Sequence, residues 1–116
     1  MSFSIILPTL NEKGHILKLI NEISNIFQNK NLLYEIIVVD DSSTDGTIEE
    51  IEKDNKNLSF IKTVLRKNLK RNLAMSINDG IKIAQYEFII WMDADFQHPP
   101  KYIKKFIEYS KTNDVI

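Results

Sequence analysis

The chain has 116 residues, a length that fits one compact domain, so we expect a single domain over residues 1–116. Hydrophobic residues make up 43% of it and charged residues 27%, which excludes a disordered chain and predicts a folded globular one. With 15 basic and 16 acidic residues the net charge is -1, which argues against a nucleic-acid partner. The chain has no cysteine, so disulfides and thiolate catalysis are excluded.

The first third of the chain shows a strand, a helix and a second strand. In residues 3–7 and 34–39 the apolar residues run on without alternation, as in parallel strands covered on both faces. Between them, apolar residues recur at spacings of four, three and four, which predicts one face of a helix that opens near Asn11 and Glu12. These apolar residues are Ile16, Ile20, Ile23 and Phe27. The order strand, helix, strand predicts a right-handed parallel crossover.

The same alternation continues to the end of the chain. Capping residues 42–45 precede a short helix, residues 58–65 form a third strand, and residues 87–92 form a fourth in which Trp91 packs in the core. A third helix is predicted with the apolar face Leu73, Ile77, Ile81 and Ala84. After Pro99 and Pro100 a further helix has the apolar face Ile103, Phe106 and Ile107, and residues 114–116 begin a fifth strand. We therefore expect an α/β fold, a mostly parallel sheet with helices on both faces.

Nothing in the sequence predicts a membrane span or an export signal. No apolar run approaches the roughly 18 residues that a span requires, and the start of the chain lacks a basic segment followed by a cleavage site. We expect a soluble chain in the cytoplasm.

Polar and charged residues gather where the predicted strands end. In open parallel sheets, ligands bind beyond the carboxyl ends of the strands. The residues found there are Pro8, Thr9, Asn11 and Glu12 after the first strand, Asp40, Asp41, Ser42 and Ser43 after the second, Arg66, Lys67, Lys70 and Arg71 after the third, and Asp93, Asp95, Gln97 and His98 after the fourth. Carboxylates that share one edge repel one another, so we expect a cation or a donor-rich ligand among them.

The triplet Asp93, Ala94, Asp95 predicts a metal site. Two carboxylates two residues apart, followed by the amide oxygen of Gln97, suit the hard divalent ions Mg²⁺ or Mn²⁺. The alternative is a solvated turn, and for His98 a structural role is favoured over metal ligation.

The other strand ends predict a nucleotide site. Asp40 and Asp41 can accept hydrogen bonds from a ribose hydroxyl or a base N–H, although Asp41 could equally cap the next helix, as Asp45 is expected to do. Glu12 could contact a nucleotide or favour a helix N-terminus. The basic residues that begin with Arg66 could hold a phosphate or form a solvated face.

Three segments together resemble a known family. The stretches SIILPTLNE, EIIVVDDSSTDGT and WMDADFQHPP are similar, in this order, to motifs of the family 2 glycosyltransferases of GT-A fold. The DAD followed by QHPP is most similar to the dolichyl-phosphate mannose synthases and the bacterial polyprenyl-phosphate hexose transferases. The resemblance runs from about Ser4 to the end of the chain.

The resemblance implies inverting transfer of a hexose from a GDP- or UDP-sugar to a polyprenyl phosphate. It implies that Asp93, Asp95 and Gln97 hold Mg²⁺ or Mn²⁺, with Asp93 and Asp95 as the catalytic carboxylates. The implied donor-binding residues are Pro8, Thr9, Asn11, Glu12, Asp40, Asp41, Ser42, Arg66, Lys70 and Ala94. The family's glycine-rich stretch RGLG is here Arg71 to Ala74, without glycine.

The resemblance also implies that this chain is the N-terminal, donor-binding part of a longer catalytic domain. Membrane contact is then expected only through parts absent from this chain, at the cytoplasmic face of a membrane. Two alternatives stay open. One is a receiver-like signalling domain that binds Mg²⁺ and is phosphorylated on an Asp, and the other is a noncatalytic nucleotide-binding remnant.

Overall fold

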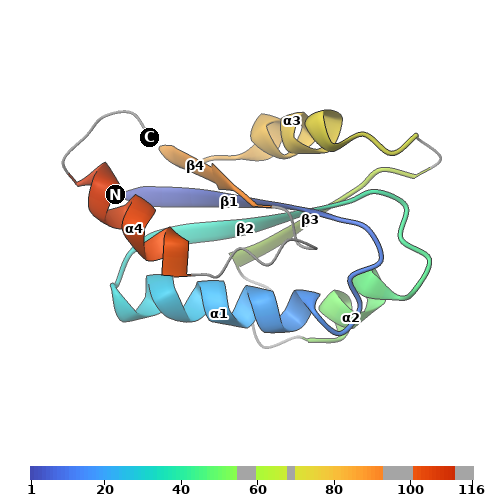
Figure 1. Cartoon of the computed structure of the whole chain (residues 1–116), viewed down its shortest axis with the longest axis horizontal. Coiled ribbons are helices and arrows are strands. Elements are labelled where there is room, and N and C mark those ends of the chain that lie inside the picture. Colours follow the sequence, from blue (N-terminus) through green and yellow to red (C-terminus); the bar gives the residue numbers. More distant parts are fainter. Residues whose placement is uncertain (55–59, 68–69, 93–100, 112–116) are drawn as a thin grey trace.

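The structure is a computed structural model that describes residues 1–54, 60–67, 70–92 and 101–111. Four parallel strands form one sheet in the order β3-β2-β1-β4. In chain order the elements are β1 (Ser2–Thr9), α1 (Ile16–Asn29), β2 (Leu33–Asp40), α2 (Thr47–Lys53), β3 (Ile61–Leu65), α3 (Leu73–Ile83), β4 (Phe88–Trp91) and α4 (Lys101–Ser110). The helices α1, α2 and α4 cover one face of the sheet and α3 covers the other (Figure 1). The predicted α/β fold, with helices on both faces, is confirmed.

The two central strands, β1 and β2, are mostly apolar because both of their faces are buried. Ile5 and Ile36 belong to the core shared with α1, α2 and α4, whereas Ile6, Ile37 and Val39 face α3. All five are fully buried. Mostly apolar segments are typical of strands that lie between two helical layers, so the prediction of two buried strands is confirmed.

The helix α1 buries the predicted face, with Ile16, Ile20, Ile23 and Phe27 in the core. It begins at Ile16, later than expected, because the chain turns first: Asn11 has a φ of 54° and Gly14 a φ of 88°. Backbone in this left-handed region cannot be part of a right-handed helix.

The helix α3 does not bury the face that its apolar spacing predicted. Leu73 and Ile81 are 41% and 44% exposed, while the buried residues of the helix are Ser76 and Gly80. A Cβ on Gly80 would lie 2.7 Å from Ile6 Cγ2. The helix lies so close to the sheet that only small residues fit at the contact, and this close approach decides which face is buried.

The predictions for β4 and α4 were partly wrong. Trp91 is 50% exposed rather than in the core, because β4 lies at the edge of the described sheet while α3 packs on β1 and β2. On α4, Ile103 and Ile107 are buried as predicted, but Phe106 is 41% exposed. The predicted fifth strand and Pro99 and Pro100 lie outside the described residues.

The strand bounds differ slightly from those predicted. The strand β3 covers Ile61–Leu65, while residues 58 and 59 of the predicted strand lie outside the described residues. The strand β4 covers Phe88–Trp91 rather than residues 87–92. Among the helices that the structure describes, none combines the length and the apolar character needed to cross a membrane.

Candidate functional site

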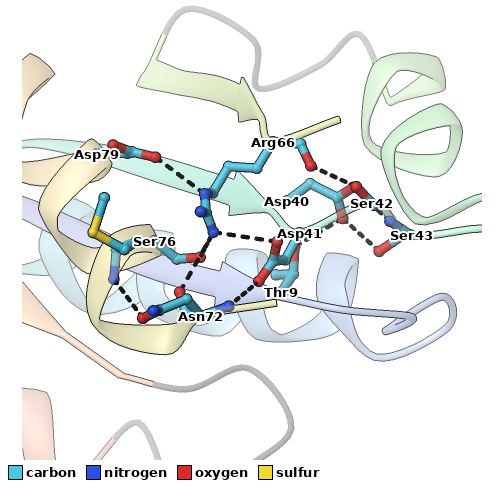
Figure 2. A network of polar contacts seen from close by, with 10 residues as sticks. Thr9, Asp40, Asp41, Ser42, Ser43, Arg66, Asn72, Ser76 and Asp79 are labelled. Carbon is cyan, nitrogen blue, oxygen red and sulfur yellow. Dashed lines mark hydrogen bonds and ion pairs between the residues drawn. The ribbon is translucent and has the colours of Figure 1, made fainter. Parts of the chain in front are cut away.

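The carboxyl ends of β1, β2 and β3 lie side by side, as the sequence predicted. Thr9 pairs with Asp40, and Asp40 pairs with Leu65. The pairing continues one residue further, since Asp41 N donates to the Thr9 carbonyl (2.9 Å) and Arg66 N donates to the Asp40 carbonyl (2.8 Å). The side chains that follow these strands therefore meet at one edge of the sheet (Figure 2).

Asp40 holds the turn after β2. Its Oδ1 accepts hydrogen bonds from Thr9 Oγ1 (3.1 Å) and Ser43 Oγ (2.5 Å), and its Oδ2 accepts one from Ser43 N (2.9 Å). Ser42, between them, has a φ of 64°, and its hydroxyl donates to the Arg66 carbonyl (2.5 Å). The buried Asp40 carboxylate thus stabilises a tight turn of the chain.

Asp41 joins the end of β2 to the start of α3 and does not cap α2. Its Oδ1 accepts from Arg66 Nη1 (3.3 Å) and its Oδ2 from Asn72 N (3.0 Å). Asn72 in turn caps α3, since its Oδ1 accepts from Met75 N (3.0 Å). The N-cap residue of α2 is Gly46, without a side-chain cap, so the prediction that Asp45 caps this helix is wrong in position. Asp45 lies one residue earlier, and its Oδ1 accepts from Thr47 N (3.1 Å).

Arg66 is buried, with its side chain only 6% exposed. Its Nε donates to Asp79 Oδ2 (3.1 Å), and its Nη1 lies within hydrogen-bond distance of Asp41 Oδ1, Ser76 Oγ and the Asn72 carbonyl (3.3, 3.3 and 3.4 Å). Figure 2 shows the guanidinium between the two carboxylates. The predicted contact of Arg66 with a phosphate stays a prediction, and these donors already have partners within the protein.

The loop after β1 is fastened to the segment after β2. Four successive backbone N–H groups donate to four side chains of that segment: Asn11 to Ser43 Oγ (2.8 Å), Glu12 to Thr47 Oγ1 (2.9 Å), Lys13 to Asp45 Oδ2 (3.1 Å) and Gly14 to Glu50 Oε2 (3.0 Å). Asn11 Oδ1 accepts from Thr44 N (2.9 Å) in return. The side-chain hydrogen bond from Thr47 is the main reason why the pKa of Asp45 lies below its ordinary value.

A shallow pocket opens between the ends of β1 and β2 and the start of α3. Its lining residues are Pro8, Thr9, Leu10, Asp41, Arg71, Leu73 and Ser76. Of the predicted donor-binding residues it includes Pro8, Thr9 and Asp41. Asn11, Asp40 and Ser42 instead make hydrogen bonds that hold the surrounding loops, while Glu12 is buried and Lys70 is exposed.

Sequence reasoning missed several residues that build this site. Leu10, Leu73 and Ser76 line the pocket, and Asp79 pairs with Arg66. Arg71 was recognised only as one of a basic group. One sequence signal could have located the start of α3. Asn72 directly precedes the apolar residue Leu73, and asparagine is a preferred N-cap residue.

The predicted metal ligands follow β4 in the sequence. Asp93, Ala94, Asp95, Gln97 and His98 lie outside the described residues. Within the described part of the chain, no group of three His, Asp or Glu side chains could hold a metal ion. The backbone just before them is placed, since Met92 N donates to the Ile6 carbonyl (3.1 Å) beside β1.

A parallel sheet with a pocket at its carboxyl edge, lined by both polar and apolar residues, defines an open α/β ligand-binding domain. The chain belongs to glycosyl transferase family 2, since the model of that family matches residues 4–116. This membership confirms the resemblance seen in the sequence and decides against a receiver-like domain.

Three known proteins illustrate the similarity. The dolichol-phosphate mannosyltransferase of Pyrococcus furiosus is 37% identical over 116 residues, which is 100% of this chain and 32% of that protein. The structure of S. aureus TarS 1-349 in complex with UDP-GlcNAc has a TM-score of 0.76 at 28% identity, over 96% of this chain and 31% of that chain.

A more distant structure has the same fold. Glucosyl-3-phosphoglycerate synthase from Mycobacterium tuberculosis, in complex with Mn²⁺, UDP-glucose and phosphoglyceric acid, has a TM-score of 0.73 at 22% identity, over 97% of this chain and 40% of that one. The fold is thus that of the GT-A glycosyltransferases. The chain spans about a third of the length of the curated relatives it matches.

Proposed function

We propose that this chain binds the nucleotide sugar of an inverting, metal-dependent hexosyltransferase that transfers a hexose from a GDP- or UDP-sugar to a polyprenyl phosphate. The observation that carries the proposal is the position of Asp41, which lines a pocket at the carboxyl edge of the sheet. Support for the acceptor comes from the similarity to a dolichol-phosphate mannosyltransferase. Support for the donor comes from the likeness to TarS, which was solved with UDP-GlcNAc.

The pocket residues have properties that suit a nucleoside diphosphate. Asp41 accepts a hydrogen bond from a base N–H or a ribose hydroxyl, while Pro8 and Leu10 give apolar surface for the base. Arg71, at the start of α3, supplies a positive charge for the phosphates. The pocket thus pairs an acceptor for the nucleoside with a cation for the phosphates.

The divalent ion is proposed to bind through Asp93, Asp95 and Gln97. When bound, it neutralises the charge that develops on the departing nucleoside diphosphate. A polyprenyl phosphate is already an anion at neutral pH, so it needs less help from a general base than a sugar hydroxyl needs. We therefore assign no general base among the described residues.

Calorimetric titration tests the proposal. UDP, GDP and their sugars are titrated into the chain with Mn²⁺, with Mg²⁺ and with EDTA. We expect one nucleotide to bind. We expect Asp41→Asn to weaken its binding about tenfold or more, because one of the two buried carboxylate oxygens that can accept from the ligand is replaced by an NH2 group. Asp54→Asn, a matched change at the far end of α2, is expected to have no effect.

Each contrary result has a distinct meaning. Absence of nucleotide binding under every condition would contradict the proposal. Binding without any transfer or hydrolysis of the sugar, also in the presence of a polyprenyl phosphate, would favour the noncatalytic alternative.

A further inference from the structure

We propose that Arg66 and Asp79 are positioning residues for nucleotide recognition, in that they hold Asp41 and the start of α3 at the spacing that the pocket requires. The inference rests on the proposed function. Arg66 and Asp79 do not line the pocket, yet Arg66 lies within hydrogen-bond distance of two residues that do, Asp41 and Ser76. A residue placed behind a pocket wall in this way shapes the site without touching the ligand.

Arg66 links three elements. It follows β3, it donates to Asp41 at the end of β2, and it contacts the first turn of α3 through the Asn72 carbonyl and Ser76 Oγ (Figure 2). Asp41 itself accepts from Asn72 N, so Asp41, Arg66 and Asn72 form a closed set of contacts. Moving any one of these groups changes the distance between the end of β2 and the start of α3, which form two of the pocket walls.

Asp79 fixes the orientation of the guanidinium. Its Oδ2 accepts from Arg66 Nε at 3.1 Å, which turns the Nη1 group toward Asp41. The side chains of Arg66 and Asp41 are each 6% exposed and that of Asp79 is 25% exposed. A buried carboxylate that loses its counter-ion is strongly destabilised where it lies, so removal of Arg66 is expected to displace Asp41.

Arginine suits this role better than lysine. The planar guanidinium presents donors in several fixed directions, and here those donors reach two carboxylates, a hydroxyl and a carbonyl. A lysine ammonium would carry the charge but could not keep this set of directions. Arg66→Lys is therefore expected to restore only part of the function that Arg66→Met removes.

The first experiment needs no ligand. Amide hydrogen exchange is measured on the free chain for Asn72, whose N–H donates to Asp41, and for the first turn of α3. We expect Arg66→Met and the milder Asp79→Asn to speed exchange at Asn72 about tenfold or more, because its acceptor has moved. The control Lys82→Gln removes a charge 4.0 Å from Asp79 Oδ1 without touching Arg66, and it is expected to leave Asn72 unchanged.

The second experiment separates positioning from direct phosphate binding. UDP and inorganic pyrophosphate are titrated, each with Mn²⁺. We expect Arg66→Met and Asp79→Asn to weaken UDP about tenfold and to weaken pyrophosphate clearly less, because Asp41 recognises the nucleoside and pyrophosphate does not contact it. If GDP proves to be the nucleotide that binds, it replaces UDP.

A double-mutant cycle then tests whether Arg66 acts through Asp41. Since the two side chains are in contact, the losses in Arg66→Met and Asp41→Asn are expected not to add in the double variant. Additive losses, equal weakening of pyrophosphate, or unchanged exchange at Asn72 in both Arg66→Met and Asp79→Asn would each overturn the inference. If Arg66→Met does not fold, Asp79→Asn decides.

The two proposals can fail separately. If no nucleotide binds to the unchanged chain, the proposed function fails while the exchange experiment still decides whether Arg66 positions Asp41. If nucleotide binds but these variants behave like Lys82→Gln, only the positioning role is wrong.

Discussion

Glu35 is a buried carboxylate in β2, 2% exposed, near the amino end of the sheet. Its Oε2 accepts from Ser4 Oγ (2.6 Å) and Gln85 N (2.8 Å), and its Oε1 lies 2.7 Å from Lys62 Nζ. Burial raises the pKa of Glu35, but the hydrogen bonds from Gln85, Lys62 and Ser4 outweigh it and bring the pKa below the ordinary 4.5. The carboxylate thus joins β1, β3 and the segment after α3.

A pH-dependent contribution to stability follows from this lowered pKa. Because the unfolded chain binds the proton more tightly, the contribution of Glu35 is fully present above pH 4.5 and is lost as the pH falls through the lower pKa of the folded state. We expect Glu35→Gln to lower the free energy of unfolding by about 1–3 kcal/mol at pH 7. Urea unfolding at several pH values measures this difference, which should shrink at strongly acidic pH. A difference that stays constant down to such pH would contradict the assignment.

Thr47 fastens the loop after β1, since its Oγ1 accepts from Glu12 N and donates to Asp45 Oδ1. Valine has nearly the same shape but cannot accept, so Thr47→Val leaves a buried N–H without this partner. We expect a loss of about 1–3 kcal/mol in the free energy of unfolding, measured by urea titration. Thr63→Val on exposed β3 surface is the matched control and should change stability by less than about 0.5 kcal/mol. Equal losses in both would show that the hydroxyl of Thr47 is not the cause.

At the scale of secondary-structure elements, the close packing of α3 on the sheet depends on a glycine at one position. Gly80 has no Cβ, and one built there would lie 2.7 Å from Ile6 Cγ2 and 3.2 Å from Val39 Cγ2. Alanine favours a helix by roughly 0.5–1 kcal/mol over glycine, whereas overpacking costs about 1–3 kcal/mol. The overlap is with buried side chains of two strands, so the overpacking term is the larger.

Gly80→Ala is therefore expected to destabilise the chain by about 1–2 kcal/mol, the difference between these opposing effects. Asn78→Ala, at an exposed position of the same helix, gives the helix-propensity effect alone and is expected to stabilise slightly. Thermal unfolding followed by circular dichroism measures both. A gain in stability for Gly80→Ala would mean that α3 can move away from the sheet at little cost.

Over the whole molecule, the sequence predicted the features that follow from the order of apolar segments and from the positions of the strand ends. Apolar segments without alternation predicted the buried strands, and the strand ends predicted that Thr9, Asp40 and Arg66 would meet. The buried face of α3 could not be predicted, because a close contact at Gly80 outweighs the apolar spacing. Trp91 was placed wrongly since composition cannot reveal that β4 lies at the edge of the described sheet.

The sequence predicted that these residues would gather at the strand ends, but it did not predict their partners. Asp41 was expected to face a ligand or cap a helix, and the structure adds that its two oxygens contact Arg66 and Asn72. The partner of Arg66 in α3, Asp79, lies thirteen residues further along the chain. Such pairings depend on how β3 and α3 are arranged in space, which a single sequence does not specify.

Binding of nucleotide and metal is expected to stabilise the molecule as a whole. A ligand that binds only the folded state adds about 2.7 kcal/mol at a hundred times its Kd, which for a domain of this size raises Tm by roughly 10 °C. We expect this rise with Mn²⁺ and the nucleotide that binds, and a smaller one when EDTA removes the metal. Asp93→Asn should give the smaller rise even with Mn²⁺, whereas Asp54→Asn should behave like the unchanged chain. If the increase in Tm were equally large in EDTA, the divalent ion would have no part in nucleotide binding by this chain. The proposed role of Asp93 as a metal ligand would then be wrong.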